Sequence, residues 1–182
     1  MKPDIFKTLE FAVRAHSGQF RKGTKLPYIV HPVDVMRILI LHNASTDAVI
    51  AGILHDTLED TPTTVDDLKQ TFGERITQLV MGASEPDKSL SWEERKKHTF
   101  EFLSQTDDTE QLMVACADKL SNVSTIKQDL DAIGDEIWTR FNRGYKQQKW
   151  YYCGLAEIFE KHIDKSDLFK EYVELIHKVF CK

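Results

Sequence analysis

The segment TDAVIAGILHDTLEDT, residues 46–61, joins an apolar run to a cluster of polar side chains. The first part has the composition of a core helix, and the polar residues at its end are His55, Asp56, Glu59 and Asp60. Burying such groups is costly unless they are paired or bind a metal ion. An imidazole beside a carboxylate suits a divalent ion, and His55 and Glu59 share a face if the helix continues between them. The simpler alternative is an amphipathic helix that ends in an exposed acidic turn. Polar residues elsewhere in the chain distinguish this alternative from a metal site.

The overall composition is that of a soluble globular protein. Hydrophobic residues make up 41% and charged residues 29% of the 182 residues, so we expect one domain, residues 1–182, with a sizeable core. The net charge of −5 argues against a DNA- or RNA-binding protein, which usually carries a basic excess. A small anionic ligand is still compatible with this charge, because the local charge around a site decides its binding.

The cysteines and the N-terminus bear on the environment of the protein. The three cysteines are Cys116, Cys153 and Cys181, and no CxxC pair occurs. This pattern indicates neither a disulfide framework nor a cysteine zinc site, and Cys116, in an apolar run, is expected to be a buried thiol. The N-terminal MKPDIFKTLEF lacks the apolar part of a signal peptide, and no apolar run approaches the roughly 18 residues of a membrane span. We therefore expect a reduced, cytoplasmic protein without membrane contact.

The spacing of the apolar residues predicts an all-α fold. Glycine and proline are sparse, with 8 and 5 residues, and apolar residues recur at helical rather than alternating spacing. Capping signals include the S-x-x-E form at Ser91, Asp107 or Glu110 before a later apolar run, and Ser45 or Thr46 before the opening segment. The other expected helices cover residues 4–16, 31–42, 63–72, 76–82, 91–104, 133–141, 144–159 and 168–180.

Two further polar residues stand where core helices are expected. His31 precedes a proline at a helix start, and Asp118 interrupts the apolar run LMVACAD. With His55 and Asp56 they supply two imidazoles and two carboxylates, a mixed nitrogen–oxygen shell for one divalent ion with positions left for water and substrate. The acidic pair that follows in the opening segment could then orient a water molecule or move a proton.

Two basic segments contrast with the net negative charge. Residues 11–33 contain no acid, but they include Arg14, Arg21, Lys22 and Lys25. In residues 137–156, again without an acid, basic residues recur every three positions, which predicts one basic stripe on a helix. The stripe consists of Arg140, Arg143, Lys146 and Lys149. Both segments would suit the phosphates of a substrate, whereas a solvated loop and a solvated helix face are the alternatives.

The order His31, His55-Asp56, Asp118 resembles the H…HD…D signature of the HD-domain metal-dependent phosphohydrolases. Within this superfamily the chain looks most like the hydrolase domain of the RelA/SpoT group, which removes the 3′-pyrophosphate from the alarmone (p)ppGpp. The likeness covers roughly residues 5–155, with AHSGQFRKGTKLPYIVHP at 15–32, ILHDTLEDT at 53–61, FGERITQLVMGAS at 72–84 and CADKLSNVST at 116–125. No stretch corresponds to a synthetase domain, and residues 92–100 and 134–152 look like those of small stand-alone bacterial members.

This resemblance implies a fold, a metal and a set of site residues. The fold would be a compact bundle of about ten helices around a central metal ion. The implied metal ligands are His31, His55, Asp56 and Asp118. The ion is usually Mn²⁺ in this group, and such a ligand set also accepts Fe²⁺, Co²⁺, Ni²⁺ or Zn²⁺. Glu59 and Asp60 match the acidic pair that assists hydrolysis. The residues that match nucleotide-contacting positions are Arg21, Lys22, Asn122 and Thr125.

Departures from the group's pattern bear on the substrate rather than on the metal chemistry. Ser121 stands where the group has a histidine, and Ser124 where it often has an arginine. Ala83-Ser84-Glu85 stands in place of Val-Thr-Lys, which reverses one charge near a polyphosphate pocket. The basic residues that could restore this charge are Lys96, Lys97, Arg143 and Lys146.

The leading hypothesis is a metal-dependent phosphohydrolase that acts on a small phosphorylated nucleotide, with (p)ppGpp as the first candidate. A phosphatase for other nucleotides, such as 5′-monophosphates or the 2′-phosphate of NADPH, is the alternative within the same chemistry. A non-catalytic module that binds a nucleotide belongs to a different class, and the presence of every ligand and both acids argues against it. The pattern does not fix the oligomeric state.

Overall fold

The computed structural model describes residues 4–85 and 89–181, and this part of the chain is helical without a β-sheet, which confirms the predicted all-α class. The ten α-helices found there are α1 Ile5–Ala15, α2 Val30–Leu41, α3 Thr46–Leu54, α4 Thr57–Asp60, α5 Val65–Phe72, α6 Glu74–Ala83, α7 Trp92–Gln105, α8 Thr109–Ile133, α9 Tyr145–Ile163 and α10 Asp167–Phe180. A 3₁₀ helix, η1 Gly134–Arg140, lies between α8 and α9. The loop before α2 contains one isolated antiparallel bridge between Phe20 and Pro27.

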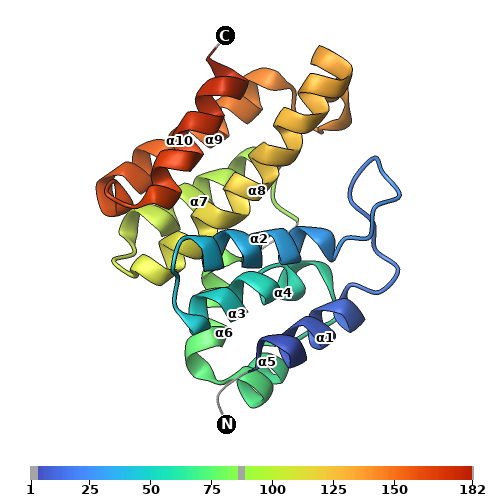
Figure 1. The fold of residues 1–182 in the computed structure, drawn as a ribbon, viewed down its shortest axis with the longest axis vertical. Coiled ribbons are helices and arrows are strands. Elements are labelled where there is room, and N and C mark those ends of the chain that lie inside the picture. Colours follow the sequence, from blue (N-terminus) through green and yellow to red (C-terminus); the bar gives the residue numbers. More distant parts are fainter. Residues whose placement is uncertain (1–3, 86–88, 182) are drawn as a thin grey trace.

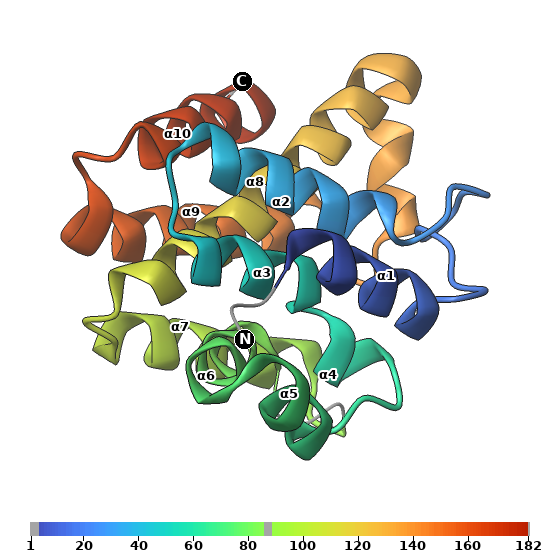
Figure 2. The ribbon, with the colours of Figure 1, turned by 60° about the horizontal axis from the view of Figure 1, so that its bottom comes forward.

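The long helix α8 lies at the centre of the bundle (Figures 1 and 2). It packs against α2, α3 and α6 from the N-terminal half and against η1, α9 and α10 from the C-terminal half. The buried apolar residues of these helices form one hydrophobic cluster. Asp118 is among the buried residues of α8, so the carboxylate that the sequence placed inside a core helix does lie there.

A glycine lets α2 and α3 pack closely. A Cβ added at Gly52 would lie 2.4 Å from Leu39 Cδ1 and 3.2 Å from Val35 Cγ1, and real Cβ atoms do not approach that closely without something moving. The close contact brings the first turn of α2, which carries His31, next to the end of α3, which precedes His55.

The helix of the opening segment is interrupted at its polar residues. α3 ends at Leu54, and the short helix α4 begins at Thr57. Asp56 between them has φ −94° and ψ −3°, and the Thr57 hydroxyl donates a hydrogen bond to the Leu54 carbonyl at 2.6 Å. A side chain that bonds a nearby carbonyl in this way competes with the regular helix. His55 and Asp56 therefore lie at a bend rather than on one continuous helix.

The capping signals that were read from the sequence are largely present. Ser91 and Glu94 form the predicted capping box at the start of α7, with hydrogen bonds in both directions. At the start of α8 the capping residue is Asp108, not Asp107 or Glu110, and its side chain accepts hydrogen bonds from two backbone amides.

The predicted basic stripe is wrong, because its members do not share one helix. Arg140 ends the 3₁₀ helix η1, Arg143 lies in the connection that follows, and only Lys146 and Lys149 belong to α9. Three residues per turn in η1 and a break before α9 change the direction of these side chains.

The state of the cysteines and the lengths of the apolar helices can be compared with the expectations from the sequence. Cys116 is buried, as expected, while Cys153 is half-buried and Cys181 is exposed, and all three are free thiols. Among the described residues, no helix combines the length and the apolar character that crossing a lipid bilayer would need.

Candidate metal centre

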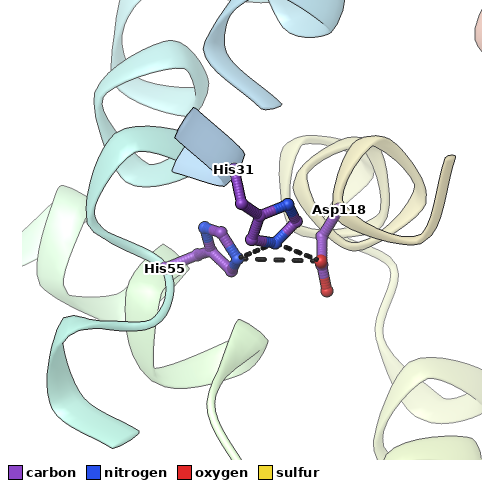
Figure 3. A group of neighbouring side chains, drawn as sticks. All are labelled: His31, His55 and Asp118. Atoms are coloured by element: carbon purple, nitrogen blue, oxygen red, sulfur yellow. Dashed lines mark hydrogen bonds and ion pairs between the residues drawn. The ribbon is translucent and has the colours of Figure 1, made fainter. Parts of the chain in front are cut away.

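Three segments of the chain bring polar side chains together at one point. His31 comes from the first turn of α2, His55 and Asp56 from the bend between α3 and α4, and Asp118 from the middle of α8. Figure 3 shows His31, His55 and Asp118 pointing toward one another. Each of these three offers one ligand atom, and the atoms lie within 4.8 Å of one another. The fold therefore places side by side three of the residues that the sequence predicted as metal ligands.

The distances identify the atoms that converge. His31 Nε2 lies 3.2 Å from His55 Nε2 and 3.1 Å from Asp118 Oδ1. Asp56 Oδ2 lies 2.9 Å from His55 Nε2 and 3.7 Å from His31 Nε2. Two ring nitrogens and two carboxylate oxygens thus face a common space, a donor set that suits a divalent ion of intermediate softness.

The other ring nitrogens fix the orientation of both imidazoles. His55 Nδ1 lies 2.8 Å from the carbonyl oxygen of Gly52, and because a carbonyl can only accept, Nδ1 carries the proton. His31 Nδ1 lies 3.1 Å from the hydroxyl of Ser121. Hydrogen bonds of this kind hold a metal-binding histidine in the correct orientation and leave Nε2 for the metal ion. Ser121, which departs from the family pattern, therefore still provides a polar partner for His31.

The charges of this cluster also suit a cation. Burial lowers the pKa of His31. Burial acts in the same direction on His55, but the neighbouring Asp56 carboxylate outweighs it and raises the pKa of His55 to about 9. Burial would raise the pKa of Asp118, but Lys119 and His31 hold that pKa well below its usual range. The anionic carboxylates thus attract positive charge to Nε2 of His55, where a metal ion and a proton compete.

Two residues next to the ligands also face the site. Tyr28 donates a hydrogen bond from its hydroxyl to Asp56 Oδ2 at 2.5 Å, and Lys119 Nζ lies 2.5 Å from Asp118 Oδ2. Burial and the carboxylate of Asp56 raise the pKa of Tyr28, so its hydroxyl remains a donor. Neither residue is predicted as a site residue from the sequence, where the only signal is position: Tyr28 lies three residues before His31, and Lys119 follows Asp118.

A polar cavity of about 190 Å³ opens beside the ligands. All of its lining side chains are polar or charged: Tyr28, His31, Asp56, Glu59, Asp60, Glu85, Arg95, Lys96, Asp118, Lys119 and Asn122. Five carboxylates and three basic groups leave an excess of two negative charges, which one divalent cation would offset. Glu59 and Asp60, the predicted acidic pair, are both in this lining. Burial, followed by the charges of Glu85 and Asp56, raises the pKa of Glu59.

A larger cavity of about 540 Å³ also has Tyr28, His31 and Asn122 in its lining. Its lining includes the other predicted nucleotide-contacting residues as well, namely Arg21, Lys22 and Thr125. Arg21 Nη2 donates to Asn122 Oδ1 at 3.2 Å, and Asn122 Nδ2 donates to Asp118 Oδ1 at 2.7 Å. A chain of hydrogen bonds therefore connects the basic loop before α2 to a carboxylate of the cluster.

Arg143 and Lys146, also predicted to contact a nucleotide, lie outside the linings of both cavities. Arg143 instead pairs with Glu93, with 2.6 Å between Nε and Oε1. Arg140, which the sequence placed in the basic stripe but not in the site, does line the larger cavity and pairs with Asp129 at 3.0 Å. Periodicity alone could not separate these arginines, because the break before α9 decides which of them turns inward.

An all-helical fold with a buried His/Asp cluster of this kind is characteristic of the HD-domain class of proteins. Residues 8–143 match the sequence model of the HD domain family, so the chain belongs to that family. The chain is 38% identical over 138 residues to the human guanosine-3′,5′-bis(diphosphate) 3′-pyrophosphohydrolase MESH1, covering 74% of each protein. It is 36% identical to the Danio rerio MESH1, covering 74% of this chain and 73% of that protein.

Longer relatives and solved structures agree with this assignment. The chain is 36% identical over 124 residues to the guanosine-3′,5′-bis(diphosphate) 3′-pyrophosphohydrolase of Aquifex aeolicus, but it spans only 18% of the length of that protein. A crystal structure of a Listeria monocytogenes EGD-e protein is similar, with a TM-score of 0.77 and 39% identity over 84% of this chain and 99% of that one. The structure of a metazoan ortholog of SpoT has the same fold, with a TM-score of 0.77 and 22% identity over 98% of this chain and 97% of that one.

Proposed function

We propose that this protein is a Mn²⁺-dependent phosphohydrolase that removes the 3′-pyrophosphate from (p)ppGpp. The observation that carries the proposal is the convergence of His31, His55 and Asp118, with Asp56 beside them, at a polar cavity that shares lining residues with a larger one. The names of the MESH1 relatives, aligned with 74% of this chain, support the choice of substrate.

The proposed roles follow from where the side chains lie. His31, His55, Asp56 and Asp118 would hold the ion. Such an ion, when bound, polarises a phosphoryl oxygen and lowers the pKa of a water ligand. Glu59 and Asp60 in the same cavity would orient the attacking water and accept its proton. Water adds to the phosphorus of the 3′-phosphoryl group, and the bond from that phosphorus to the ribose 3′ oxygen breaks. The ribose oxygen leaves with a proton, which gives GDP and pyrophosphate.

The larger cavity would hold the nucleoside. Arg21, Lys22, Asn122 and Thr125 line it, and Arg21 lies with its guanidinium carbon 5.8 Å from the centroid of the Tyr28 ring. A planar guanidinium next to an aromatic ring can stack on a base. A contribution of Arg143 or Lys146 stays a prediction from the sequence, and the ion pair with Glu93 would have to open before Arg143 could reach a substrate.

The proposal also covers the domain organisation, the cellular location and the class of ligand. We propose one hydrolase domain, residues 1–182, because the buried apolar residues form one cluster. A cytoplasmic location is supported by three free thiols, and a small nucleotide rather than DNA or RNA is supported by the net charge of −5.

The deciding experiment is a substrate panel with the purified, Mn²⁺-loaded protein. ppGpp, a nucleoside 5′-monophosphate and NADPH are compared at equal concentration, and pyrophosphate and orthophosphate are measured separately. We expect pyrophosphate and GDP from ppGpp at a far higher rate than orthophosphate from the other two. Turnover of NADPH or of the monophosphate alone would favour the alternative phosphatase, and nucleotide binding without turnover with any of Mn²⁺, Fe²⁺, Co²⁺, Ni²⁺ or Zn²⁺ would favour a binding module.

Metal removal is expected to lower the melting temperature. A ligand that is present at about 100 times its Kd stabilises the folded state by about 2.7 kcal/mol. In a domain of this size 1 kcal/mol shifts the melting temperature by about 2–4 °C, so a chelator should lower it by roughly 5–10 °C. The measurement is thermal unfolding before chelation, after chelation and after addition of Mn²⁺. An unchanged melting temperature, with metal analysis confirming that the ion has been removed, would contradict a metal centre that links three helical segments.

A further inference from the structure

We propose that Lys96, together with Arg95 and Lys119, binds the pyrophosphate group of the substrate, and that Glu85 acts as an internal counter-ion which weakens this binding and so sets specificity. The assignment of that group as the one that leaves rests on the proposed function. Binding of a pyrophosphate anion at this position is argued from the cavity itself.

The three basic side chains reach the polar cavity from two helices. Arg95 and Lys96 belong to α7, and Lys119 follows Asp118 on α8. They line the same cavity of about 190 Å³ as His31, Asp56 and Asp118. At about 30 Å³ per water molecule this space holds a few waters or a small anion, while the nucleoside requires the larger cavity. Asp56 and Asp118 line this cavity but not the larger one, which reaches the cluster only at His31, so a phosphate in contact with the whole cluster would lie in the cavity that these cations line.

Glu85 is held against two of these cations. Its side chain is 11% exposed, and one carboxylate oxygen accepts a hydrogen bond from Lys96 while the other lies 2.5 Å from Arg95 Nη1. Burial would raise the pKa of Glu85, but Lys96 and the other cations lower it, so the carboxylate is anionic near neutral pH. Because Glu85 occupies the donors that a phosphate would use, an incoming phosphate has to share or displace it.

Aromatic rings keep Lys96 in place beside the cavity. Its ammonium lies 4.7 Å from the centroid of the buried Tyr151 ring and 6.0 Å from that of Trp92. A cation over an aromatic face is attracted by the ring, so Lys96 keeps its position when Glu85 loses its charge. The amide of glutamine at position 85 can still accept a hydrogen bond from Lys96 without adding a negative charge. Glu85→Gln therefore separates the effect of the charge from that of the geometry.

The test compares Glu85→Gln and Lys96→Met with the wild type, and Lys97→Met is the matched control because Lys97 is the exposed neighbour of Lys96 on α7 and lines neither cavity. Each protein, with its divalent ion bound and free metal removed, is titrated with inorganic pyrophosphate and separately with orthophosphate. Tryptophan fluorescence reports binding, since Trp92 lies beside Lys96. Metal content is measured afterwards, and only samples that retain the ion are compared.

We expect Lys96→Met to weaken pyrophosphate binding by roughly 10- to 100-fold, as for the loss of a hydrogen bond to a charged group. Glu85→Gln should tighten it by up to roughly fivefold, the scale of a partly exposed charge pair, and Lys97→Met should leave it unchanged. With ppGpp, Lys96→Met should raise KM and Glu85→Gln should lower it. Tighter binding in Glu85→Gln cannot result from misfolding, so this variant keeps the test decisive even if Lys96→Met is unstable.

Two results would overturn the inference. One is pyrophosphate binding that is the same in all four proteins. The other is weaker binding in Glu85→Gln, which would show that the Glu85–Lys96 pair only joins α7 to the end of α6. If pyrophosphate binding follows the expected order but ppGpp is not hydrolysed, the proposed substrate fails while the anion site stands. If ppGpp is hydrolysed and pyrophosphate binding is insensitive to both residues, the anion site fails alone.

Discussion

Replacing His55 by alanine is expected to abolish metal binding and to reduce kcat/KM for ppGpp by about a thousandfold or more. His55 Nε2 lies within 3.2 Å of His31 Nε2 and 2.9 Å of Asp56 Oδ2, so its loss removes one of the two ring nitrogens of the cluster. A metal ion supplies several kcal/mol of transition-state stabilisation, and each 1.36 kcal/mol corresponds to about a factor of ten in rate. Metal content per chain and the rate of pyrophosphate release are the two measurements.

His98→Ala is the control, because His98 is exposed on α7 and lines neither cavity of the site. It should keep both the metal ion and the activity. Since truncating the buried His55 also leaves a void, Asp118→Asn, which keeps the shape of its side chain, serves as a second variant and should lose the ion as well. A His55→Ala protein that is folded, free of metal and fully active would rule out the proposed centre.

Replacing Glu59 by glutamine is expected to lower kcat by roughly 10²- to 10⁴-fold, the range for the loss of general acid–base catalysis, while the metal ion stays bound. Glu59 lines the polar cavity with the ligands but does not belong to the converging His/Asp cluster. Only the ionised carboxylate can accept a proton, and burial raises its pKa. The wild-type rate should therefore fall as the pH is lowered through that pKa, and Glu59→Gln should lose this acid limb of the profile.

Asp60→Asn is also expected to lower kcat while the metal ion stays bound, because Asp60 lines the same cavity. The matched control is Asp66→Asn, a carboxylate in the first turn of α5 that is exposed and lies outside both cavities. Loss of the metal ion in Glu59→Gln would instead assign Glu59 to the ligands. An unchanged kcat and pH profile in both variants would remove the acidic pair from the mechanism.

Local signals in the sequence predicted most of the helices. Apolar spacing and caps such as Ser91 with Glu94 depend on neighbours within one or two turns, and these boundaries agree with the structure. Each residue at the centre is a polar group next to apolar helical sequence: His31 stands at a helix start, His55 follows a helix end, and Asp118 lies inside a helix. Such a position is visible along the chain, because a buried polar group requires a partner.

The remaining features depend on contacts between distant segments. The bend at Asp56 follows from side-chain hydrogen bonds and from packing around α8, and helical periodicity does not show it. The break between η1 and α9 separates Arg140 from Arg143 for a similar reason. In the sequence, Glu85 replaces a lysine of the group's pattern and so reverses one charge. The fold pairs this carboxylate with Arg95 and Lys96 from α7.

The origin of the ligands in three separate segments has a consequence for how this protein is maintained in the cell. α2, the α3–α4 bend and α8 are joined through His31, His55, Asp56 and Asp118, which span 88 positions of the chain. A bound ion would therefore act as a cross-link between these segments, and a chain with any one of them detached would lose most of its affinity for the ion. Loss of the ion would then favour local opening and proteolysis, so a shortage of the ion would reduce the amount of enzyme as well as its activity.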